Sequence, residues 1–139
     1  MLTNTRTIRV QWGDCDPASI VFYPRYFEWF DAGTILLFEK ATAMTKIRML
    51  AQYGGAGLAL VEARAKFYVP SRYGDDIRIE TRVAEFRRSS FDVHHRVFKD
   101  QTLALEGFES RVWTARDPSD PRKLISAPIP TEVRARFNA

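Results

Sequence analysis

The chain has 139 residues, one cysteine and a mildly basic composition, with 21 lysine and arginine residues against 17 aspartate and glutamate residues and a net charge of +4. This length is typical of a single domain, here residues 1–139, which buries enough surface to fold without a disulfide or a structural metal. The single Cys15 excludes an internal disulfide, no apolar run reaches the roughly 20 residues that span a bilayer, and the first residues carry no signal-peptide pattern, so we expect a soluble, cytoplasmic protein with no membrane partner.

The positive charge is mixed with negative charge along the chain and suits an anionic small molecule or an acidic partner. No basic run is interleaved with aromatic residues as in a known RNA- or DNA-binding motif, so we expect no nucleic-acid partner. Aromatic residues make up 13% of the chain. Many of these rings must therefore be buried, either in a core or in a subunit interface.

The first predicted elements are a strand and a long helix. Thr5–Trp12 alternates, with Ile8, Val10 and Trp12 on one face, and ends at the Gly13 turn. Turn-forming residues follow, and from Phe22 to Ala41 large apolar side chains recur at helical spacing. The opposite side of this helix is also apolar, which is typical of a helix enclosed by other structure.

The remaining elements are a short helix and four strands. Met44–Tyr53 predicts the helix, which ends at a glycine-rich stop. Period-two alternation then predicts four strands in the segments Leu58–Val69, Ile77–Val83, Phe91–Val97 and Thr102–Thr114. Gly107 is a candidate bulge within the last strand. We expect Asp117–Pro121 to be a loop, and the residues after Ile129–Pro130 to form a short charged end.

This order of elements predicts an α+β protein in which an antiparallel five-stranded sheet wraps around one long central helix. A single sheet curled around the helix supplies most of the apolar cover that the helix needs. Such a sheet has edges, and pairing of edges between two copies predicts a homodimer, with exposed rings from the helix region meeting there.

Several residues carry a resemblance to a known family. They are Gly-Asp-Cys-Asp-Pro-Ala at 13–18, Ile-Val at 20–21, an aromatic pair at 22–23, Pro-x-Tyr at 24–26 and Trp-x-Asp-Ala at 29–32. This pattern resembles the 4-hydroxybenzoyl-CoA thioesterase family of hotdog-fold acyl-CoA thioesterases. The segment Glu85–Phe91 is similar to the one that holds the nucleotide end of CoA in that family, and the order of elements agrees over essentially the whole chain.

The resemblance implies roles for residues at three places in the chain. Asp16 is the catalytic carboxylate, and the backbone amide of Tyr23, at the start of the central helix, polarises the thioester carbonyl. Asp31 lies near the acyl group, with aromatic lining from Trp29 or Phe30. The phosphate contacts fall to three residues at the corresponding turn, Arg87, Arg88 and Ser89, and arginine suits this task because its planar fork pairs with phosphate oxygens.

Two residues depart from the family pattern. Ser19 stands where the motif usually has glycine, and it either tightens the loop before the helix or adds a hydroxyl there. Ser89 replaces a basic residue of an Arg-Arg-Lys cluster, which weakens the expected grip on the nucleotide.

Residue types alone limit the mechanism. A thioester has a good leaving group, so its hydrolysis needs an oxyanion site and a carboxylate that acts as a nucleophile or as a base on water. We favour Asp16 as the nucleophile because the resemblance points that way. His94 and His95 point to opposite faces of a strand and cannot form a two-histidine metal site, and we expect neither a metal nor any cofactor beyond the CoA thioester substrate.

The candidate residues also have structural interpretations. Aspartate before proline often closes an Asx turn or caps a helix, and this is the structural alternative for Asp16. For Asp14 we prefer a structural role, in which its carboxylate closes the turn by accepting backbone N–H groups. Cys15 between two carboxylates is a poor thiolate and a better packing residue. Asp31 among apolar neighbours meets either a substrate hydroxyl or a protein donor. Arg87 and Arg88, taken alone, are also typical of a solvated turn.

Together these observations predict a thioesterase that hydrolyses an acyl-CoA or aroyl-CoA thioester and works as a homodimer or homotetramer. One alternative is a non-catalytic hotdog protein that binds acyl-CoA. Another is a thioesterase that acts on an acyl chain held by an acidic carrier protein. The acyl group itself cannot be read from the sequence, since apolar pockets discriminate weakly on bulk.

Overall fold

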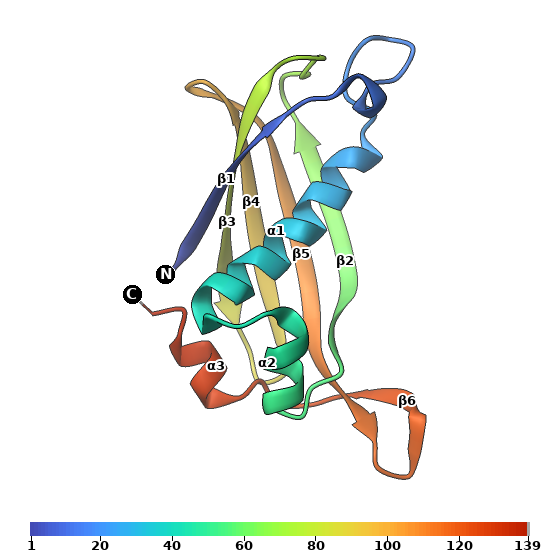
Figure 1. Ribbon diagram of the computed structural model, residues 1–139, viewed down its shortest axis with the longest axis vertical. Coiled ribbons are helices and arrows are strands. Elements are labelled where there is room, and N and C mark those ends of the chain that lie inside the picture. The colour runs from blue at the N-terminus through green and yellow to red at the C-terminus, as the bar shows by residue number, and fades with distance from the viewer. Residues whose placement is uncertain (139) are drawn as a thin grey trace.

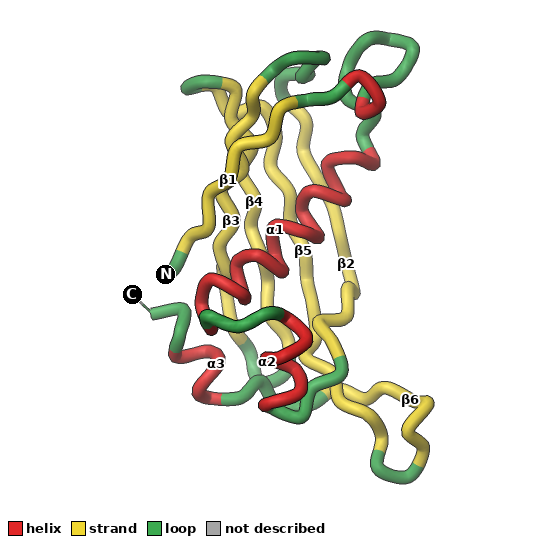
Figure 2. Tube along the Cα trace, viewed as in Figure 1, coloured by secondary structure: helices red, strands yellow, loops and turns green. Residues whose placement is uncertain are grey.

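The computed structural model describes residues 1–138 and shows one long helix lying across a curled antiparallel sheet (Figure 1). The sheet has six strands in the order β1-β3-β4-β5-β2, with β6 paired to β5. Its strands are β1 (Thr3–Arg9), β2 (Gly57–Phe67), β3 (Asp76–Phe86), β4 (Ser90–Lys99), β5 (Thr102–Asp117) and β6 (Asp120–Ser126). The helices are α1 (Pro24–Thr42), α2 (Lys46–Gln52) and α3 (Thr131–Ala135), so the predicted α+β hotdog arrangement is confirmed (Figure 2).

The central helix α1 begins and ends where its sequence requires. Pro24 occupies the first helical turn, where its fixed φ is favourable and its missing N–H costs nothing. Ala43 ends the helix in the left-handed region at φ 56°. Within residues 1–138, no helix combines the length and apolar character needed to cross a membrane.

The core has two apolar clusters along α1. One surrounds Phe30 near the start of the helix, and the other surrounds Phe38 near its end, together with α2 and α3. Between them, buried polar side chains occupy the helix–sheet interface, namely Thr34, Thr81, His95, Glu109 and Arg111. A β-carbon on Gly33 would lie 3.0 Å from Thr81 Oγ1, so the helix approaches the sheet closely at this polar layer.

The predicted bulge at Gly107 is wrong. Gly107 pairs regularly with His95 of β4 and with Ala65 of β2, and the register shifts fall elsewhere in the sheet. Gly107 instead lies against the ring of Phe30, and a β-carbon at this position would overlap the ring. The glycine is therefore required by the close approach of the α1 side chain to the sheet.

Trp12 is also misassigned by the sequence pattern. Strand β1 ends at Arg9, and Trp12 lies in the short 3-10 turn η1 (Trp12–Asp14) with 76% of its surface exposed. Asp14 Oδ2 accepts a hydrogen bond from the Gln11 N–H at 2.8 Å, and the Asp14 N–H donates to the Gln11 carbonyl at 3.0 Å. This local capping by Asp14 overrides the alternation that continued to Trp12.

The C-terminal segment contains two elements that the sequence did not predict. After the turn at Asp117, β6 adds a sixth strand to the expected five, and its hairpin projects from the body of the protein (Figure 1). The expected charged end folds as α3, with Val133 and Phe137 fully buried. Strand β6 is a short hairpin partner of β5, and α3 has only five residues, so local pattern carries little signal for either element. Phe137, just after α3, packs against Phe38, which is far away in the sequence.

Candidate active site

The loop that carries Asp16 is folded back on itself before α1. Cys15 and Val21 form an isolated antiparallel bridge, the Phe22 N–H donates to the Asp14 carbonyl at 2.8 Å, and the Asp16 N–H donates to the Ile20 carbonyl at 2.9 Å. The Val21 N–H also donates to the Ser71 carbonyl at 2.9 Å. These bonds fix the loop to the end of the sheet, next to the start of the helix.

The carboxylate of Asp16 has one oxygen bound and one available. Oδ1 accepts the Ala18 N–H at 2.8 Å, which is the Asx turn that the sequence allowed. Oδ2 has no hydrogen-bond partner among residues 1–138. Asp16 lines a cavity of about 290 Å³ whose walls include Trp12, Cys15 and Tyr73. The structural role and an available carboxylate oxygen thus coexist in one side chain.

Ser19 adopts φ 66°, in the left-handed region. This is the position where the family pattern has glycine, the residue that reaches this region without steric cost. The Ser19 N–H donates to the Asp16 carbonyl at 2.9 Å, so the strained residue closes the turn that holds Asp16. Of the two possibilities for Ser19, the structure shows the tight turn.

The start of α1 presents one unpaired amide. Arg25 and Tyr26 donate their N–H groups to the carbonyls of Phe22 and Tyr23, and Pro24 has no N–H. The Tyr23 N–H has no acceptor within the described residues. Tyr23 is 60% exposed and lines an apolar cavity of about 510 Å³ between α1 and the segment that follows β2. Asp16 and Tyr23 therefore lie at the same end of the protein but line neighbouring cavities.

Asp31 lies two turns further along α1, in a third cavity of about 360 Å³. Apolar walls come from Pro24, Phe27 and Leu60, while Asp31 and Arg111 supply charge. The side chain of Asp31 is 64% exposed, and its Oδ1 accepts a hydrogen bond from Arg111 Nη2 at 2.8 Å. The protein donor weighed for Asp31 is therefore present, and Oδ2 has no partner within residues 1–138.

Arg111 is the cavity-facing end of a buried network. Its Nε donates to Glu109 Oε1 at 3.1 Å, its Nη2 to Glu109 Oε2 at 2.9 Å and its Nη1 to the Leu58 carbonyl at 3.0 Å. Thr34 Oγ1 donates to Glu109 Oε1 at 2.5 Å. His95 Nε2 lies 3.2 Å from the same oxygen, and its Nδ1 lies 2.8 Å from Thr81 Oγ1.

The charge states in this network follow from burial and pairing. Burial lowers the pKa of His95, so the imidazole is neutral near pH 7 despite the neighbouring Glu109. Burial alone would raise the pKa of Glu109, but hydrogen bonds from His95, Arg111 and Thr34 bring it to about 2. Arg111 is the permanent positive charge beside Glu109, and its two hydrogen bonds favour the ionised carboxylate.

Neither of the two aromatic residues expected to line the acyl site is among the residues that line the cavity beside Asp31. Trp29 packs edge-on against Tyr26 at 5.4 Å, and its carbonyl accepts Arg6 Nη2, on the side of α1 that faces β1. Phe30 is buried and stacks on His95 at 4.6 Å. Phe27 and Leu60 are the large apolar residues that share a cavity with Asp31.

The turn Arg87–Ser89 contains two arginines, of which Arg87 is hydrogen-bonded to neighbouring side chains and Arg88 is available. Arg87 donates to both carboxylate oxygens of Asp92, at 2.6 and 2.9 Å, and also to Glu85 and Ser90. The Arg88 guanidinium has no partner among residues 1–138. Ser89 contributes its carbonyl to the Trp113 N–H. Arg134 of α3, a residue that the sequence did not single out, donates to the carbonyls of Arg87 and Arg88.

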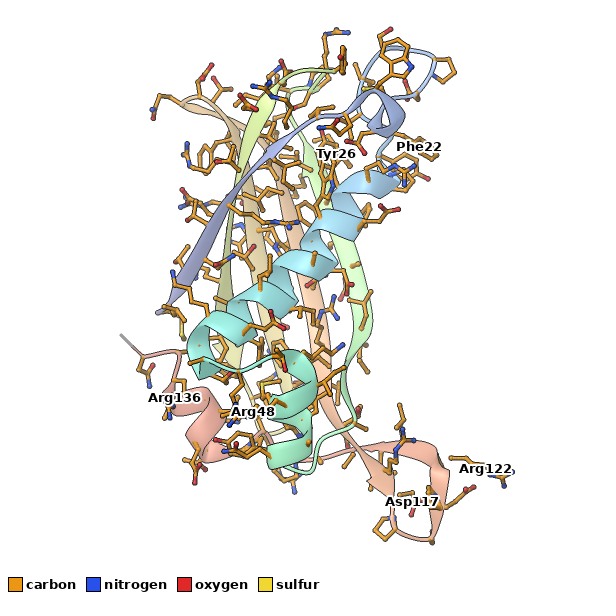
Figure 3. The ribbon with its side chains drawn as sticks, viewed as in Figure 1. Phe22, Tyr26, Arg48, Asp117, Arg122 and Arg136 are labelled. Atoms are coloured by element: carbon orange, nitrogen blue, oxygen red, sulfur yellow. The ribbon has the colours of Figure 1, made fainter. Side chains whose placement is uncertain are left out.

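This turn and the Asp16 loop lie at opposite ends of the sheet. The residues before the loop pair with the start of β3, through Arg9 and Asp76, whereas Arg87 follows the end of β3. A strand of eleven residues is roughly 35 Å long. Figure 3 labels Phe22 and Tyr26, which follow the Asp16 loop, at one end of the molecule, and Asp117 and Arg122, from the β5–β6 hairpin, at the other.

Arg111 and Glu109 are the site residues that sequence reasoning missed. Their signal was present, because both occupy inward positions of the alternating strand β5, between the buried Gly107 and Trp113. A charged pair on the covered face of a sheet is rare unless its members bind each other or a ligand. The two histidines, by contrast, lie as predicted, with His95 buried and His94 on the outer face against Glu106.

Comparison with known proteins agrees with this geometry. The model of the thioesterase-like superfamily matches residues 10–137. A 4-hydroxybenzoyl-CoA thioesterase from Pseudomonas sp. strain CBS-3 is 34% identical over 114 residues, which cover 78% of this chain and 81% of that protein. A crystal structure of 4-hydroxybenzoyl-CoA thioesterase from the same strain superposes with a TM-score of 0.86 at 30% identity, over 96% of this chain and 98% of the other.

A second solved structure, of a gentisyl-coenzyme A thioesterase, gives a TM-score of 0.79 at 32% identity, over 94% of this chain and 99% of the other. The match to the family model spans nearly all of the sequence, and the fold agrees with both solved structures over almost their whole length. The chain belongs to the thioesterase-like superfamily of hotdog-fold proteins.

Proposed function

We propose that this protein is a thioester hydrolase that cleaves an aroyl-CoA or acyl-CoA thioester to the free acid and CoA. The observation that carries the proposal is that two groups lie at the same end of α1. They are the Asp16 carboxylate, which has an available oxygen, and the Tyr23 N–H, which has no acceptor within the described residues. A carboxylate and an amide at a helix N-terminus are the two groups that thioester hydrolysis needs. Membership in a thioesterase family supports the same reaction.

The chemistry follows from these two groups. The Asp16 carboxylate attacks the carbonyl carbon, the Tyr23 N–H stabilises the developing oxyanion, and the C–S bond breaks to release CoA thiolate, which takes a proton from solvent. Water then cleaves the mixed anhydride, which releases the acid and restores Asp16. The alternative is that Asp16 removes a proton from water, which attacks the thioester directly. Neither route uses a metal or another cofactor.

The cavity beside Asp31 suits the acyl group. It begins at Pro24, next to the Tyr23 amide, and reaches Asp31 eight residues beyond Tyr23. At the helical rise this spacing is about 12 Å, comparable to a para-substituted benzoyl group with a hydrogen bond at each end. Phe27 and Leu60 offer apolar cover for a ring, and Asp31 Oδ2 can accept a ring hydroxyl. The relatives named for 4-hydroxybenzoyl-CoA and gentisyl-coenzyme A support an aroyl substrate.

The nucleotide end of CoA is assigned to Arg88, because its guanidinium is available whereas Arg87 is bound within its own hairpin. Ser89 offers a hydroxyl beside it. One protomer cannot join this turn to its own Asp16, since the two lie at opposite ends of the sheet. The proposal therefore requires a second copy of the chain.

A homodimer through β2 satisfies that requirement. β2 is at an edge of the sheet and pairs only with β5 within the described residues, and it exposes Leu60 and Val61. Antiparallel pairing of β2 with the β2 of a second copy would continue the sheet. Each Asp16 loop would then lie at the same end as the partner's phosphate-binding turn. A homotetramer would be a pair of such dimers, and a cytoplasmic location fits a chain whose one cysteine forms no internal disulfide.

Asp16→Asn tests the proposal sharply. The amide oxygen of asparagine can still accept the Ala18 N–H, so the loop is retained while the carboxylate chemistry is lost. We expect thiol release from 4-hydroxybenzoyl-CoA to fall by at least about 1,000-fold in the variant, with an unchanged unfolding midpoint. The matched control is Asp100→Asn, a change at an exposed aspartate in the β4–β5 turn.

Three results would redirect the assignment. Full activity in Asp16→Asn would remove Asp16 from the reaction. Binding of 4-hydroxybenzoyl-CoA by the wild-type protein without any thiol release would indicate a non-catalytic acyl-CoA-binding protein. Faster release from an acyl carrier protein than from CoA would indicate the carrier-protein substrate.

A further inference from the structure

The guanidinium of Arg111 faces the cavity beside Asp31, yet almost all of its hydrogen-bonding capacity is used by the protein. Of its five N–H donors, two bind Glu109, one binds the Leu58 carbonyl and one binds Asp31. Arg111 is 4% exposed. A ligand in the cavity therefore meets an arginine that has little left to donate.

The same contacts prevent Arg111 from turning toward a ligand. Glu109 is 5% exposed and is itself held by Thr34 and His95 from two other elements, α1 and β4. Leaving Glu109 charged and unpaired in the core is strongly unfavourable, so Arg111 stays bound to it. The bonds to Glu109 thus fix the orientation of the guanidinium, and the Arg111 Nη2 that faces the cavity is directed at Asp31.

The side chains around the cavity beside Asp31 carry a net negative charge. Arg111 contributes one positive charge, while Glu109 and Asp31 contribute one negative charge each, and His95 is neutral near pH 7. Glu28 also lines the cavity but is paired with Arg25 at 3.0 Å, so it adds no net charge to this sum. The group offered to a ligand is the available oxygen of Asp31, which accepts hydrogen bonds and repels anions.

We propose that Arg111, fixed by Glu109, is a positioning residue that sets acyl specificity: it holds Asp31 so that the cavity selects acyl groups carrying a hydroxyl donor and rejects acyl groups carrying a carboxylate. This inference rests on the proposed thioesterase function, and it adds both the discrimination against anionic acyl groups and the residues responsible for it. Selectivity of this kind combines an attractive contact for one substrate with a repulsive one for its competitor.

Three CoA thioesters test the inference through ratios of kcat/KM. They are benzoyl-CoA, 4-hydroxybenzoyl-CoA and 4-carboxybenzoyl-CoA. For the wild-type protein we expect the hydroxylated substrate to exceed benzoyl-CoA by about tenfold to a hundredfold, and the carboxylated substrate to fall below benzoyl-CoA by a similar factor. Asp31→Asn removes the charge and weakens the hold on the Arg111 Nη2 donor. We expect this variant to lose the hydroxyl preference and to gain at least about tenfold for the carboxylated substrate relative to benzoyl-CoA.

A second variant separates positioning from folding. Glu109→Gln with Arg111→Gln neutralises both buried partners together, which avoids an unpaired buried charge. We expect its hydroxyl preference to fall about tenfold, mainly through KM, although Asp31 is intact. Adding Asp31→Asn to this double variant should give a smaller gain for the carboxylated substrate than Asp31→Asn alone, because the Arg111 donor that Asp31→Asn would free is absent. Arg96→Gln, an arginine change on the outer face of the sheet, is the control and should leave both ratios unchanged.

The outcomes are distinguishable. If the wild-type protein releases thiol from none of the three substrates, the aroyl-CoA thioesterase assignment on which the inference rests fails. If it hydrolyses benzoyl-CoA but shows no preference among the three, or if Asp31→Asn gives no gain for the carboxylated substrate, the thioesterase assignment stands and the role of Arg111 is overturned.

Discussion

Gly107 of β5 lies against the ring of Phe30. A β-carbon at position 107 would overlap the ring carbon Cε2 and lie 2.7 Å from the ring carbons Cδ2 and Cζ. The helix can therefore rest on the sheet at this depth only because residue 107 has no side chain. We expect Gly107→Ala to lower the free energy of unfolding by about 1–3 kcal/mol, since the core must shift to admit the methyl group.

Denaturant titration checks this prediction, with Gly13→Ala as the control because a β-carbon on Gly13 meets nothing within 4 Å. Adding Phe30→Leu to Gly107→Ala should restore part of the loss. If Gly107→Ala is as stable as the wild-type protein, the close contact is not limiting.

Ser19 carries backbone strain at φ 66° in the loop that holds Asp16. Glycine reaches this region freely, whereas serine pays a steric cost, so we expect Ser19→Gly to stabilise the protein by up to about 1 kcal/mol. Ala18→Gly is the matched control, and it should destabilise by about 0.5–1 kcal/mol because its backbone is not in the left-handed region. A loss of stability in Ser19→Gly would contradict this account.

Acid should weaken the fold through Glu109. The pKa of Glu109 is about 2 in the folded protein, below its value of 4.5 in the unfolded chain. As the pH falls, the unfolded state therefore binds the proton first. The stabilisation that the ionised carboxylate gives above about pH 4.5 is lost as the pH approaches 2. The shift corresponds to about 3 kcal/mol. The pKa of His95 is also lowered, so its protonation opposes folding in acid in the same direction.

Urea titrations of the wild-type protein and Glu109→Gln between about pH 5 and about pH 2 isolate the Glu109 contribution. The variant should be less stable at neutral pH and should lose about 3 kcal/mol less than the wild-type protein across that interval. Parallel pH curves for the two proteins would show that Glu109 is not the group responsible.

The edge strand β2 should be the dimer contact. Val61 is 67% exposed in the middle of this strand, and a charge there opposes edge pairing. We expect Val61→Lys to halve the mass measured by light scattering and to reduce thioesterase activity at least about tenfold, because each site needs the partner's turn. Ile47→Lys, at the 81% exposed Ile47 of α2, is the control and should keep the wild-type mass.

Arg88 and Arg87 should differ in function despite being neighbours. Arg88→Ala is expected to raise KM for a CoA thioester by about tenfold and to leave KM for the matching pantetheine thioester unchanged, because pantetheine lacks the nucleotide phosphates. Arg87→Ala removes the bonds to Asp92 and should mainly lower stability. Equal KM values of Arg88→Ala and wild type for the CoA thioester would remove Arg88 from nucleotide binding.

Much of the fold could be read from the sequence because its signals are local and repeated. The apolar spacing of α1 and the alternation of β3 and β4 gave elements whose bounds the structure reproduces within a few residues. The motif around Asp16 gave the family, and the family model matches residues 10–137. The prediction that the first strand continues to Trp12 was wrong because the Asp14 side chain caps a turn there. Residue periodicity alone does not reveal such a cap.

The sequence by itself determined the class of the fold, the enclosed central helix and the carboxylate loop at its start, because each of these depends on neighbours within a few residues. Only the tertiary structure decided that Gly107 admits Phe30, that Trp29 turns away from Asp31, and that Arg111 and Glu109 meet between helix and sheet. The same is true of the distance between Asp16 and Arg88. Gly107 and Phe30 are 77 positions apart, and Asp16 and Arg88 are 72 positions apart. Such relationships exist only once the sheet has curled around the helix and fixed which side chains share a face.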